Sequence, residues 1–470
     1  MKKTKIICTM GPACSDRETL KEMMLSGMNV ARFNFSHGTH EEHLERIELF
    51  KSVRDELGVP AAMMLDTKGP EYRIKTFKND KVTLKDGAYF SLTSNDVEGD
   101  GERVSVSYKG MIDELNVGDK ILLNNGLIIL EAVEKTDTDI ICKVEVGGEL
   151  SNRKSMSFPN KVLKQMYLSE QDKADLLFGI KADFDYVACS FVSCKQDVLD
   201  VRNFLNENGG GEIDIIAKIE NRSGVDNIDE ILSVSDGIMV ARGDMGVEIP
   251  YEELPAIQKK LITTCRYRGK RVITATEMLE SMIHNPRPTR AEISDVANAV
   301  YDGTSAVMLS GETAAGKFPV EAVRAMSKIT QETEKNINYK KRFLTSSFEI
   351  RNMTDALSHS TCSLAMDVGA TAIVACTRSG MTARLISRFR SPIPIIGMTT
   401  NEKVYRKLAL SWGVLPVMTE EFESTDVLFY HAVMKAKQSG LCNPGDAIVI
   451  TGGITNGKSG NTNIIKVEKI

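Results

Sequence analysis

Eight apolar runs of strand length recur along the amino-terminal two thirds of the chain, and helix-length segments separate most of them. Buried parallel strands are continuous apolar runs, and each crossover between them needs a helix-length connection. Eight successive units are the number that closes a β/α barrel, whereas a doubly wound open sheet would not usually need eight. We therefore predict an α/β fold built on a (β/α)8 TIM barrel. Its strands are expected at Lys5–Thr9, Asn29–Phe35, Ala61–Asp66, Asp185–Phe191, Ile213–Glu220, Gly237–Asp244, Arg271–Thr276 and Ala306–Ser310.

One long interval, from Asp66 to Ser169, lacks a helical period and alternates polar with apolar residues instead. Turn residues such as Asn124-Asn125-Gly126 punctuate it, which indicates an all-β module inserted after the third strand. After Asn336 strands and helices alternate again, which predicts an open α/β domain. The expected organisation is a barrel over 1–69 and 167–340, an inserted β lid over 70–166 and a C-terminal α/β domain over 345–470.

The overall charge is nearly balanced, with 59 basic and 64 acidic side chains and a net charge of −5. No broad basic field is available for nucleic acid, and no basic amphipathic segment favours a membrane surface. The apolar runs are too short to span a membrane, and the first residues lead directly into a strand instead of a signal sequence. Nine scattered cysteines without a C-x-x-C pair indicate packing thiols in a reduced, cytoplasmic protein.

Polar residues end three consecutive strands of the expected barrel. Lys218 and Glu220 are two apart on one strand and point to the same face. Asp244 follows the turn at Gly243, and Thr276 ends the next strand. The carboxyl ends of barrel strands meet at one mouth, so one ammonium and two carboxylates are expected to converge there. Glu220 and Asp244 would suit Mg²⁺ or Mn²⁺. A buried structural ion pair and a capping aspartate are the open alternatives.

Two earlier strands end in a further set of polar residues. Arg32, Asn34 and Ser36 share one face, and a guanidinium is a good clamp for phosphate. Asp66 and Thr67 end the next strand. Together the amide, the carboxylate and the two hydroxyls form an all-oxygen cage for a second, weakly held cation. Turn capping is the alternative explanation for Asn34 and Ser36.

Several longer motifs have an order and a spacing that are highly specific. They are Cys8-Thr9-Met10-Gly11-Pro12, Phe33-Asn34-Phe35-Ser36-His37-Gly38, Leu65-Asp66-Thr67-Lys68-Gly69-Pro70-Glu71, Lys218-Ile219-Glu220-Asn221, Met239-Val240-Ala241-Arg242-Gly243-Asp244 and Asn285-Pro286-Arg287-Pro288-Thr289-Arg290-Ala291-Glu292. With these motifs the chain resembles the pyruvate kinase family over nearly its whole length. The resemblance is to bacterial members without an extra C-terminal phosphotransfer-like domain.

The resemblance implies transfer of the phosphoryl group of phosphoenolpyruvate to ADP, which gives ATP and, after protonation of the enolate, pyruvate. This is the last step of glycolysis. It implies that Lys218 stabilises the moving phosphoryl group and the enolate, that Arg32 grips the phosphoryl oxygens and that Thr276 lies on the proton-delivery side.

The resemblance also implies the ligand sets of the site. Mg²⁺ would lie at Glu220 and Asp244, and K⁺ at Asn34, Ser36, Asp66 and Thr67. Family members with a glutamate at the position of Glu71 look K⁺-dependent, so K⁺ dependence is expected here. The substrate-binding set would be Arg32, Lys218, Gly243, Asp244 and Thr276, with the turn from Ala241 to Asp244 receiving the carboxylate. The nucleotide-binding set would be Asn34, His37, Arg73 and Lys154.

The C-terminal domain carries a hydroxyl-rich loop before a helix, and in the family this loop belongs to the site of a sugar-phosphate activator. An ordinary strand-to-helix turn is the alternative. The family further suggests a homotetramer and allosteric control. The loop consists of Thr377, Arg378, Ser379, Gly380 and Thr382.

This chain departs from the family pattern mainly at the lid and its contacts, so lid closure and nucleotide affinity are less determined than the reaction. None of the departures removes Lys218 or an expected metal ligand. They are Asn124 and Asn125 for two aspartates, Phe158 and Asn160 at the return to the barrel, Ser193-Cys194 for a basic pair, Glu277 for a glutamine, and Tyr72 and Ile74 around Arg73.

Two other functions stay open from the sequence. A barrel carbon–carbon lyase would handle similar enolates, but the inserted lid and the cation cage argue against it. A non-catalytic paralogue that senses sugar phosphates would fit the altered lid. Retention of Lys218, Glu220, Asp244 and Thr276 argues against that paralogue.

Overall fold

The computed structural model describes residues 1–159, 161, 163–422, 424–453 and 462–470. Its centre is a closed barrel of parallel strands in the order β1-β17-β16-β15-β14-β13-β3-β2, which confirms the predicted fold class. The strands are β1 (Lys5–Thr9), β2 (Val30–Asn34), β3 (Ala62–Asp66), β13 (Tyr186–Cys189), β14 (Asp214–Ile219), β15 (Gly237–Ala241), β16 (Arg271–Ala275) and β17 (Ala306–Leu309).

Most of these strands are shorter than the apolar runs that predicted them, because the polar residues at the carboxyl ends leave the sheet. The largest difference concerns Asp244, which was expected at the end of a strand. β15 stops at Ala241, and Asp244 lies in the first turn of helix α8 (Arg242–Glu248). An acidic side chain in a first helical turn is favourable, because the helix dipole is positive there.

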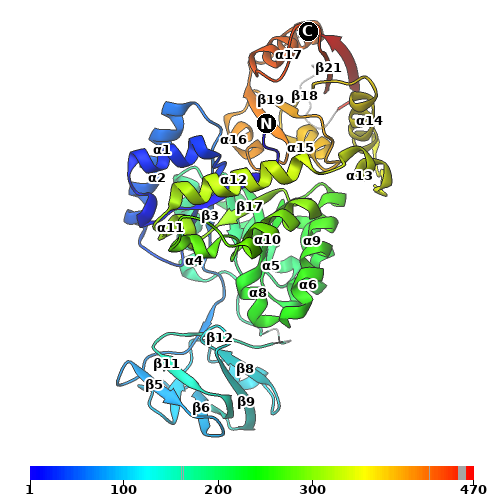
Figure 1. Ribbon diagram of the computed structural model, residues 1–470. Coiled ribbons are helices and arrows are strands. Elements are labelled where there is room, and N and C mark those ends of the chain that lie inside the picture. Colours follow the sequence, from blue (N-terminus) through cyan, green and yellow to red (C-terminus); the bar gives the residue numbers. More distant parts are fainter. Residues whose placement is uncertain (160, 162, 423, 454–461) are drawn as a thin grey trace.

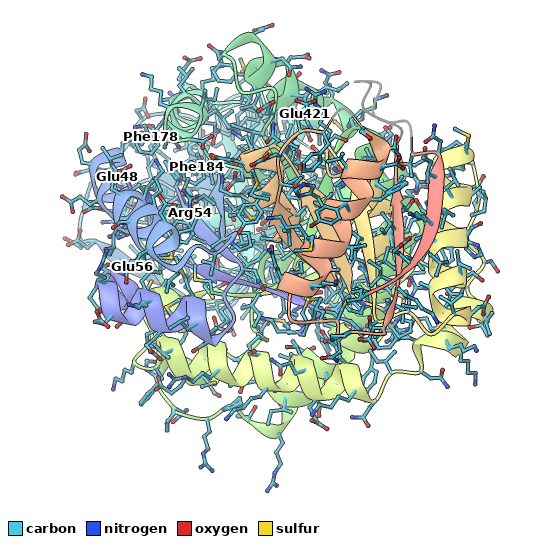
Figure 2. All side chains as sticks on the ribbon, turned by 90° about the horizontal axis from the view of Figure 1, so that it is seen from above. Glu48, Arg54, Glu56, Phe178, Phe184 and Glu421 are labelled. Atoms are coloured by element: carbon cyan, nitrogen blue, oxygen red, sulfur yellow. The ribbon has the colours of Figure 1, made fainter. Side chains whose placement is uncertain are left out.

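Helices surround the barrel and cover the outer faces of its strands (Figure 1). Apolar side chains between strands and helices form the largest core, and a second core fills the barrel interior. Seen from above, Phe178 and Phe184 lie next to α2, whose surface carries Glu48 and Arg54 (Figure 2). The main helices are α1 (Arg17–Ser26), α2 (His40–Leu57), α4 (Glu170–Lys181), α5 (Lys195–Glu207), α6 (Arg222–Asp226), α7 (Ile228–Val234), α9 (Leu254–Arg268), α10 (Arg290–Asp302), α11 (Gly311–Ala314) and α12 (Pro319–Lys335).

The predicted β module follows β3 and has its own apolar core. Its larger sheet has the order β4-β12-β8-β9-β10-β6-β7, and β11 pairs with β5 beside it. One helical turn, α3 (Met111–Glu114), interrupts the strands. The strands are β4 (Tyr72–Arg73), β5 (Lys81–Leu84), β6 (Tyr89–Thr93), β7 (Arg103–Ser105), β8 (Lys120–Leu123), β9 (Ile128–Lys135), β10 (Asp139–Val146), β11 (Gly148–Ser151) and β12 (Ser155–Ser157).

The C-terminal part is an open sheet in the order β20-β19-β18-β21-β22, in which only β22 runs antiparallel. The sequence analysis did not predict α13 and α14, which precede this sheet. The elements are α13 (Tyr339–Thr345), α14 (Met353–Asp367), β18 (Ala372–Cys376), α15 (Met381–Ser387), β19 (Ile395–Thr399), α16 (Glu402–Leu408), β20 (Val414–Met418), α17 (Thr425–Gln438), β21 (Ala447–Gly452) and β22 (Ile464–Lys469).

The inserted sheets and the C-terminal part lie at opposite ends of the barrel (Figure 1). The insert follows the carboxyl end of β3, so it stands over the mouth where the polar strand ends meet. The C-terminal part covers the other end, and its Leu410 packs inside the barrel with Ile7 and Tyr186. Among the described helices, none is both long and apolar enough for a membrane span.

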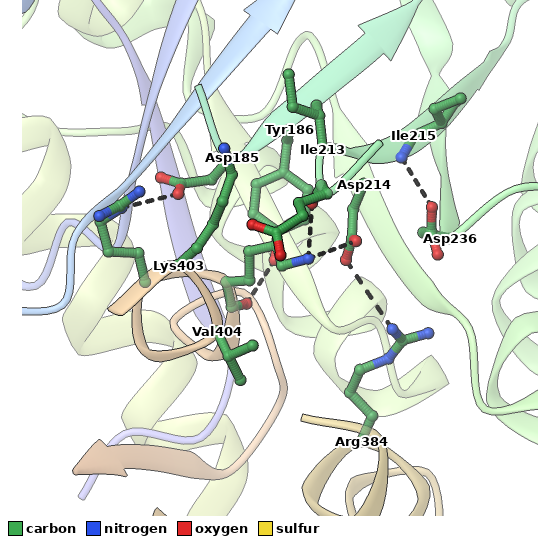
Figure 3. A network of polar contacts seen from close by, with 12 residues as sticks. Asp185, Tyr186, Ile213, Asp214, Ile215, Asp236, Arg384, Lys403 and Val404 are labelled. Atoms are coloured by element: carbon green, nitrogen blue, oxygen red, sulfur yellow. Dashed lines mark hydrogen bonds and ion pairs between the residues drawn. The ribbon is translucent and has the colours of Figure 1, made fainter. Parts of the chain in front are cut away.

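Ion pairs hold the C-terminal part against the amino end of the barrel, and Asp214 is central to them (Figure 3). Its carboxylate lies 2.7 Å from Arg271, 2.9 Å from Lys407 and 3.9 Å from Arg384. Burial acts to raise the pKa of Asp214, but these three cations outweigh it and hold the pKa well below its ordinary value.

We expect Asp214→Asn to destabilise the fold at pH 7 by about 3–5 kcal/mol, because it leaves buried cations without their counter-ion. A carboxyl group whose pKa is lower in the folded than in the unfolded protein contributes its full stabilisation above the unfolded pKa of roughly 3.9. This stabilisation is lost as the pH falls toward the folded pKa. Thermal unfolding of both proteins from pH 7 to pH 3 should therefore show a difference that shrinks below about pH 4.

Asp229→Asn is the matched control, because Asp229 is exposed and pairs with Arg268 at the surface. It should cost less than about 1 kcal/mol. A difference between wild type and Asp214→Asn that stays constant over this pH range would contradict the role given to the Asp214 carboxylate.

Candidate active site

Lys218 lies at the carboxyl end of β14, and its ammonium group is fixed by three side chains from three strand ends. Its Nζ donates to Ser190 Oγ at 2.7 Å and to Asp66 Oδ1 at 3.0 Å. Glu220 Oε1 lies 3.0 Å away. An unbranched side chain loses its freedom when several acceptors hold it, so the positive charge is placed at a defined point of the mouth.

Arg32 reaches the same point from the end of β2. Its Nε donates to Asp66 Oδ2 at 2.6 Å, and its guanidinium also donates to Thr9 Oγ1 at 3.0 Å. The Asp66 carboxylate therefore lies between two cations, and the structure brings Arg32 and Lys218 together around it.

The charges of Arg32, Lys218, Asp66 and Glu220 act on one another and set the protonation states of Asp66 and Lys218. Burial acts to raise the pKa of Asp66, but Arg32 and Lys218 outweigh it and hold the pKa below its ordinary value. Burial likewise acts to lower the pKa of Lys218, but Asp66 and Glu220 outweigh it and raise the pKa. Lys218 therefore stays an ammonium ion at neutral pH and can stabilise negative charge without giving up its proton.

Glu220 is fully buried, and its two oxygens have different surroundings. Oε2 accepts a hydrogen bond from the backbone N–H of Phe191 at 2.6 Å. Oε1 accepts no hydrogen bond from the described residues, although the Lys218 ammonium lies beside it. Burial raises the pKa of Glu220 to about 7, with Lys218 opposing the rise and Asp244 adding to it.

The two carboxylates expected at a divalent metal differ in exposure. Asp244 is exposed on the first turn of α8, whereas Glu220 is buried directly after β14. Among the described residues, no cluster of three or more His, Cys, Asp or Glu side chains has metal-ligand geometry. Two protein carboxylates, with one buried oxygen free of hydrogen bonds, still fit a Mg²⁺ ion that takes its other ligands from substrate and water.

Thr276 directly follows β16 and has a strained conformation. Its φ of 66° and the φ of 53° at Glu277 lie in the left-handed region, which β-branched and bulky residues avoid. Thr276 Oγ1 accepts from the N–H of Gly243 at 2.7 Å and donates to the Ala275 carbonyl at 2.6 Å. Strain of this kind persists only where surrounding contacts hold it, and it concentrates at functional sites.

Arg242 supplies those contacts. Its guanidinium donates to the carbonyl oxygens of Thr276 at 2.7 Å and Glu277 at 2.9 Å, and pairs with Asp295 at 2.6 Å. The N–H of Gly243 was expected to receive a substrate carboxylate, but here it is bonded to the Thr276 hydroxyl. A ligand in this turn would have to share or displace that hydrogen bond.

The residues expected around a monovalent cation come from two neighbouring strands. Asn34 pairs in register with Asp66, and the buried Thr67 follows it. Ser36 lies in the exposed turn, where its N–H donates to Asn34 Oδ1 at 3.2 Å. The Asp66 oxygens are bonded to Arg32 and Lys218, so a cation would have to share them.

A cavity of about 220 Å³ lies between the insert and the barrel mouth. Tyr72, Asn125 and Phe158 line it from the insert, and Asn221 and Asp244 line it from the barrel. Several departures from the family pattern therefore line this one cavity, namely Tyr72, Asn125, Phe158 and Ser193. Asn124 and Asn125 have φ of 51° and 56°, which Asn tolerates better than most residues. Asn160 is outside the described residues.

The residues expected at the nucleotide lie on both sides of the mouth. Arg73 pairs in register with Ser155, so it lies next to Lys154 on the insert. Its guanidinium pairs with Glu71 at 2.5 Å and donates to the Arg153 carbonyl at 2.6 Å. His37 is exposed in the turn after β2, on the barrel side.

The loop expected at an activator joins β18 to α15 as a strand-to-helix turn. The Thr377 N–H donates to the Met398 carbonyl at 2.9 Å, and Gly380 has a φ of 79° just before α15. Thr382 Oγ1 lies 2.7 Å from Thr462 Oγ1, so this side chain contacts the residues just before β22. Arg378 and Ser379 are exposed.

Ser190 was missed from the sequence, and Thr9 and Arg242 were named only as parts of motifs, although each of the three contacts an expected site residue. Ser190 lies just beyond β13, and its hydroxyl bonds both Lys218 and the Thr67 carbonyl. A polar residue directly after a buried strand was the available signal. It predicts a place at the mouth, but it does not say which neighbouring strand end the side chain will contact.

These features define the class of the protein: a β/α-barrel enzyme whose mouth holds an ammonium, a guanidinium and buried carboxylates that can stabilise developing negative charge. The family model described as "Pyruvate kinase, barrel domain" matches residues 1–323, and "Pyruvate kinase, alpha/beta domain" matches residues 355–468. The chain belongs to the pyruvate kinase family, which confirms the resemblance inferred from its motifs.

Individual relatives agree with the family models. A pyruvate kinase from Clostridium acetobutylicum is 48% identical, with all of both chains covered. One from Clostridium perfringens is 45% identical, again with all of both chains covered. One from Geobacillus stearothermophilus is 48% identical over all of this chain, which spans 80% of that relative.

Proposed function

We propose that the chain transfers the phosphoryl group of phosphoenolpyruvate to ADP and releases ATP and pyruvate. The observation that carries this proposal is the Lys218 ammonium, held by Asp66, Ser190 and Glu220 at the mouth below the insert. Phosphoryl transfer needs positioning and positive charge around the moving group more than covalent chemistry from the protein. Membership of the family supports the same reaction.

In this proposal each residue acts through the charge or hydrogen bond that it brings to the mouth. Arg32 binds phosphoryl oxygens, and Lys218 stabilises the phosphoryl group as it leaves and the enolate oxygen that remains. Asp66 keeps both cations in place. We propose that the Thr276 hydroxyl, at the end of β16 and held by the Gly243 N–H, lies on the side from which the enolate carbon would receive a proton.

Glu220 and Asp244 are the residues that we propose to hold Mg²⁺ or Mn²⁺. A bound divalent ion would neutralise phosphoryl charge and orient the substrate oxygens. The buried Oε1 of Glu220 supports this assignment, because it accepts no hydrogen bond from the described residues, and the negative charge of Asp244 acts on Glu220 and raises its pKa.

The reaction is tested by following ATP and pyruvate formation from phosphoenolpyruvate and ADP in buffer with Mg²⁺ and K⁺. Stoichiometric formation of both products is expected. Absence of product at high enzyme concentration would favour a sugar-phosphate sensor, and cleavage of a longer acid would favour a lyase.

We also propose dependence on K⁺, held by Asn34, Ser36, Asp66 and Thr67. Replacing K⁺ by Na⁺ at constant Mg²⁺ should lower the rate at least about tenfold, because a cation near the phosphoryl group would be lost. Initial rates in KCl and NaCl give the comparison.

Glu71→Lys is the informative variant for this prediction, because a lysine at this position would itself supply the positive charge that K⁺ otherwise brings. It should reduce the difference between the two salts. Equal rates of the wild-type enzyme in both salts would remove the K⁺ site from the proposal.

We propose that ADP lies between His37 on the barrel and Arg73 and Lys154 on the insert. A sugar-phosphate activator would bind at Thr377, Arg378, Ser379, Gly380 and Thr382. A homotetramer in the cytoplasm is the expected form. The nine cysteines are all unpaired, which suits a reducing compartment.

A further inference from the structure

A basic cavity lies at the end of the barrel opposite the active site, where the C-terminal part meets the start of β16. Its lining contains Lys270, Arg271, Arg384, Arg388 and Arg390. No carboxylate lines it among the described residues. Like charges gathered in a buried space repel one another unless opposite charge compensates them.

The neighbouring carboxylates compensate only part of this charge. Asp214 lies 2.7 Å from Arg271 and 3.9 Å from Arg384, and it also pairs with Lys407. Arg384 extends from α15 toward Asp214 in Figure 3. Asp355 lies 3.3 Å from Arg388.

Arg390 is the least compensated of these cations. It is 3% exposed, and its hydrogen bonds within the described residues go to neutral groups: the carbonyls of Gly303 and Ser387 and the hydroxyls of Ser305 and Ser387. Its guanidinium lies 4.9 Å from the centre of the Trp412 ring. Burial, together with the charges of Arg266 and Arg342, lowers the pKa of Arg390 to about 9. An anion nearby would relieve this cost.

The hydrogen-bond inventory of the lining also points to an acceptor. The buried Nε atoms of Arg271, Arg384 and Arg388 and the hydroxyl of Ser411 have no hydrogen-bond partner among the described residues. The guanidinium groups can only donate. An anion can accept from several of them at once, whereas a water molecule would direct its own hydrogens toward cations.

We propose that this basic cavity binds one small inorganic anion of the halide class, which ties the barrel to the C-terminal part. The free space at its centre is about 10 Å³, which admits one particle of about the size of water. The lining comes from both parts, with Lys270 and Arg271 on the barrel and Arg384 and Arg390 on the C-terminal side. Chloride therefore fits the cavity, whereas a nucleotide or a sugar phosphate does not.

Trp412 gives a direct measurement, because it lines the cavity and is the only tryptophan of the chain. Its emission is followed in the full-length protein while sodium bromide replaces sodium gluconate at constant ionic strength. Collisional quenching should be weak, because the Trp412 side chain is 3% exposed. Bromide that binds in the cavity should therefore make the emission fall along a saturating curve. A linear fall that is identical in wild type and Lys270→Gln would overturn the proposal.

Lys270→Gln removes one positive charge from the lining and should shift the bromide midpoint several-fold upward. Lys173→Gln is the matched control, since Lys173 is on the surface of α4 and pairs with Glu170. It should keep the wild-type midpoint. Ser411→Ala removes one donor without removing charge, and it should also raise the midpoint, which keeps the test available if Lys270→Gln does not fold.

Crystals soaked in sodium bromide provide the second readout. An anomalous peak is expected inside the cavity, within hydrogen-bond distance of the arginine side chains. An ordered water there without anomalous signal would overturn the proposal. Neither readout depends on catalysis, so both outcomes are independent of the proposed kinase activity.

Discussion

Lys218→Met is expected to lower kcat at least about a thousandfold, which is the range found for single cations that stabilise phosphoryl transfer. The methionine side chain fills a similar volume but carries no charge. Asp66 would keep its contact with Arg32, whereas Glu220 would lose the only cation that pairs with it among the described residues. Steady-state kinetics with phosphoenolpyruvate and ADP measure the effect, and circular dichroism reports whether the fold is retained.

One further variant separates charge from geometry, and a second serves as a surface control. Lys218→Arg keeps the positive charge, but its planar guanidinium cannot reproduce the three contacts of one ammonium group. It should recover only a small part of the rate. Lys335→Met is the matched control, because Lys335 is exposed on α12 and pairs with Glu332. A Lys218→Met enzyme that is folded and retains more than a tenth of wild-type kcat would refute the central role of this residue.

Glu220→Gln should lower kcat/KM by about a hundredfold or more and raise the Mg²⁺ concentration that half-saturates the rate. Changes in groups that only support metal ligands already cost 10–100-fold in affinity or activity, so loss of a charged ligand should cost at least as much. The amide keeps the volume and can still accept from the Phe191 N–H. Initial rates over a range of Mg²⁺ concentrations, together with Mn²⁺ binding followed by electron paramagnetic resonance, give both quantities.

Stability distinguishes this variant from a merely misfolded one. Burial already disfavours the charged form of Glu220, so a neutral amide should change the thermal midpoint only slightly. Glu332→Gln, on the exposed face of α12, is the matched control and should behave as wild type. Unchanged Mg²⁺ dependence in a stable Glu220→Gln enzyme would move the metal site elsewhere.

The barrel could be predicted from the sequence because its strands are unusually uniform. A parallel strand buried on both faces must be a continuous apolar run, so β1, β14 and β16 are visible without any structure. The ends of the strands were less predictable. The expected strand continued through Arg242-Gly243-Asp244, but the chain turns into α8 after Ala241, and periodicity cannot separate a strand end from the first turn of a helix.

The site was predictable as a set of residues, but its contacts were not. Lys218, Asp66 and Arg32 could be placed at one mouth, because parallel strand ends meet there. The sequence did not show that Ser190 would complete the contacts of Lys218, or that Arg242 would hold Thr276 in a left-handed conformation. Both depend on the exact stagger of neighbouring strands. Such details follow from packing between residues that are far apart in the sequence.

Leu410 gives the chain a particular order of assembly. The interior of the barrel begins with Ile7 and is completed by a side chain that is synthesised some four hundred residues later. During translation the strands would therefore emerge long before the apolar end of their cylinder can be covered. The nascent barrel must wait, exposed at one end, until the C-terminal part arrives, so the final step of folding and the joining of the two parts are one event.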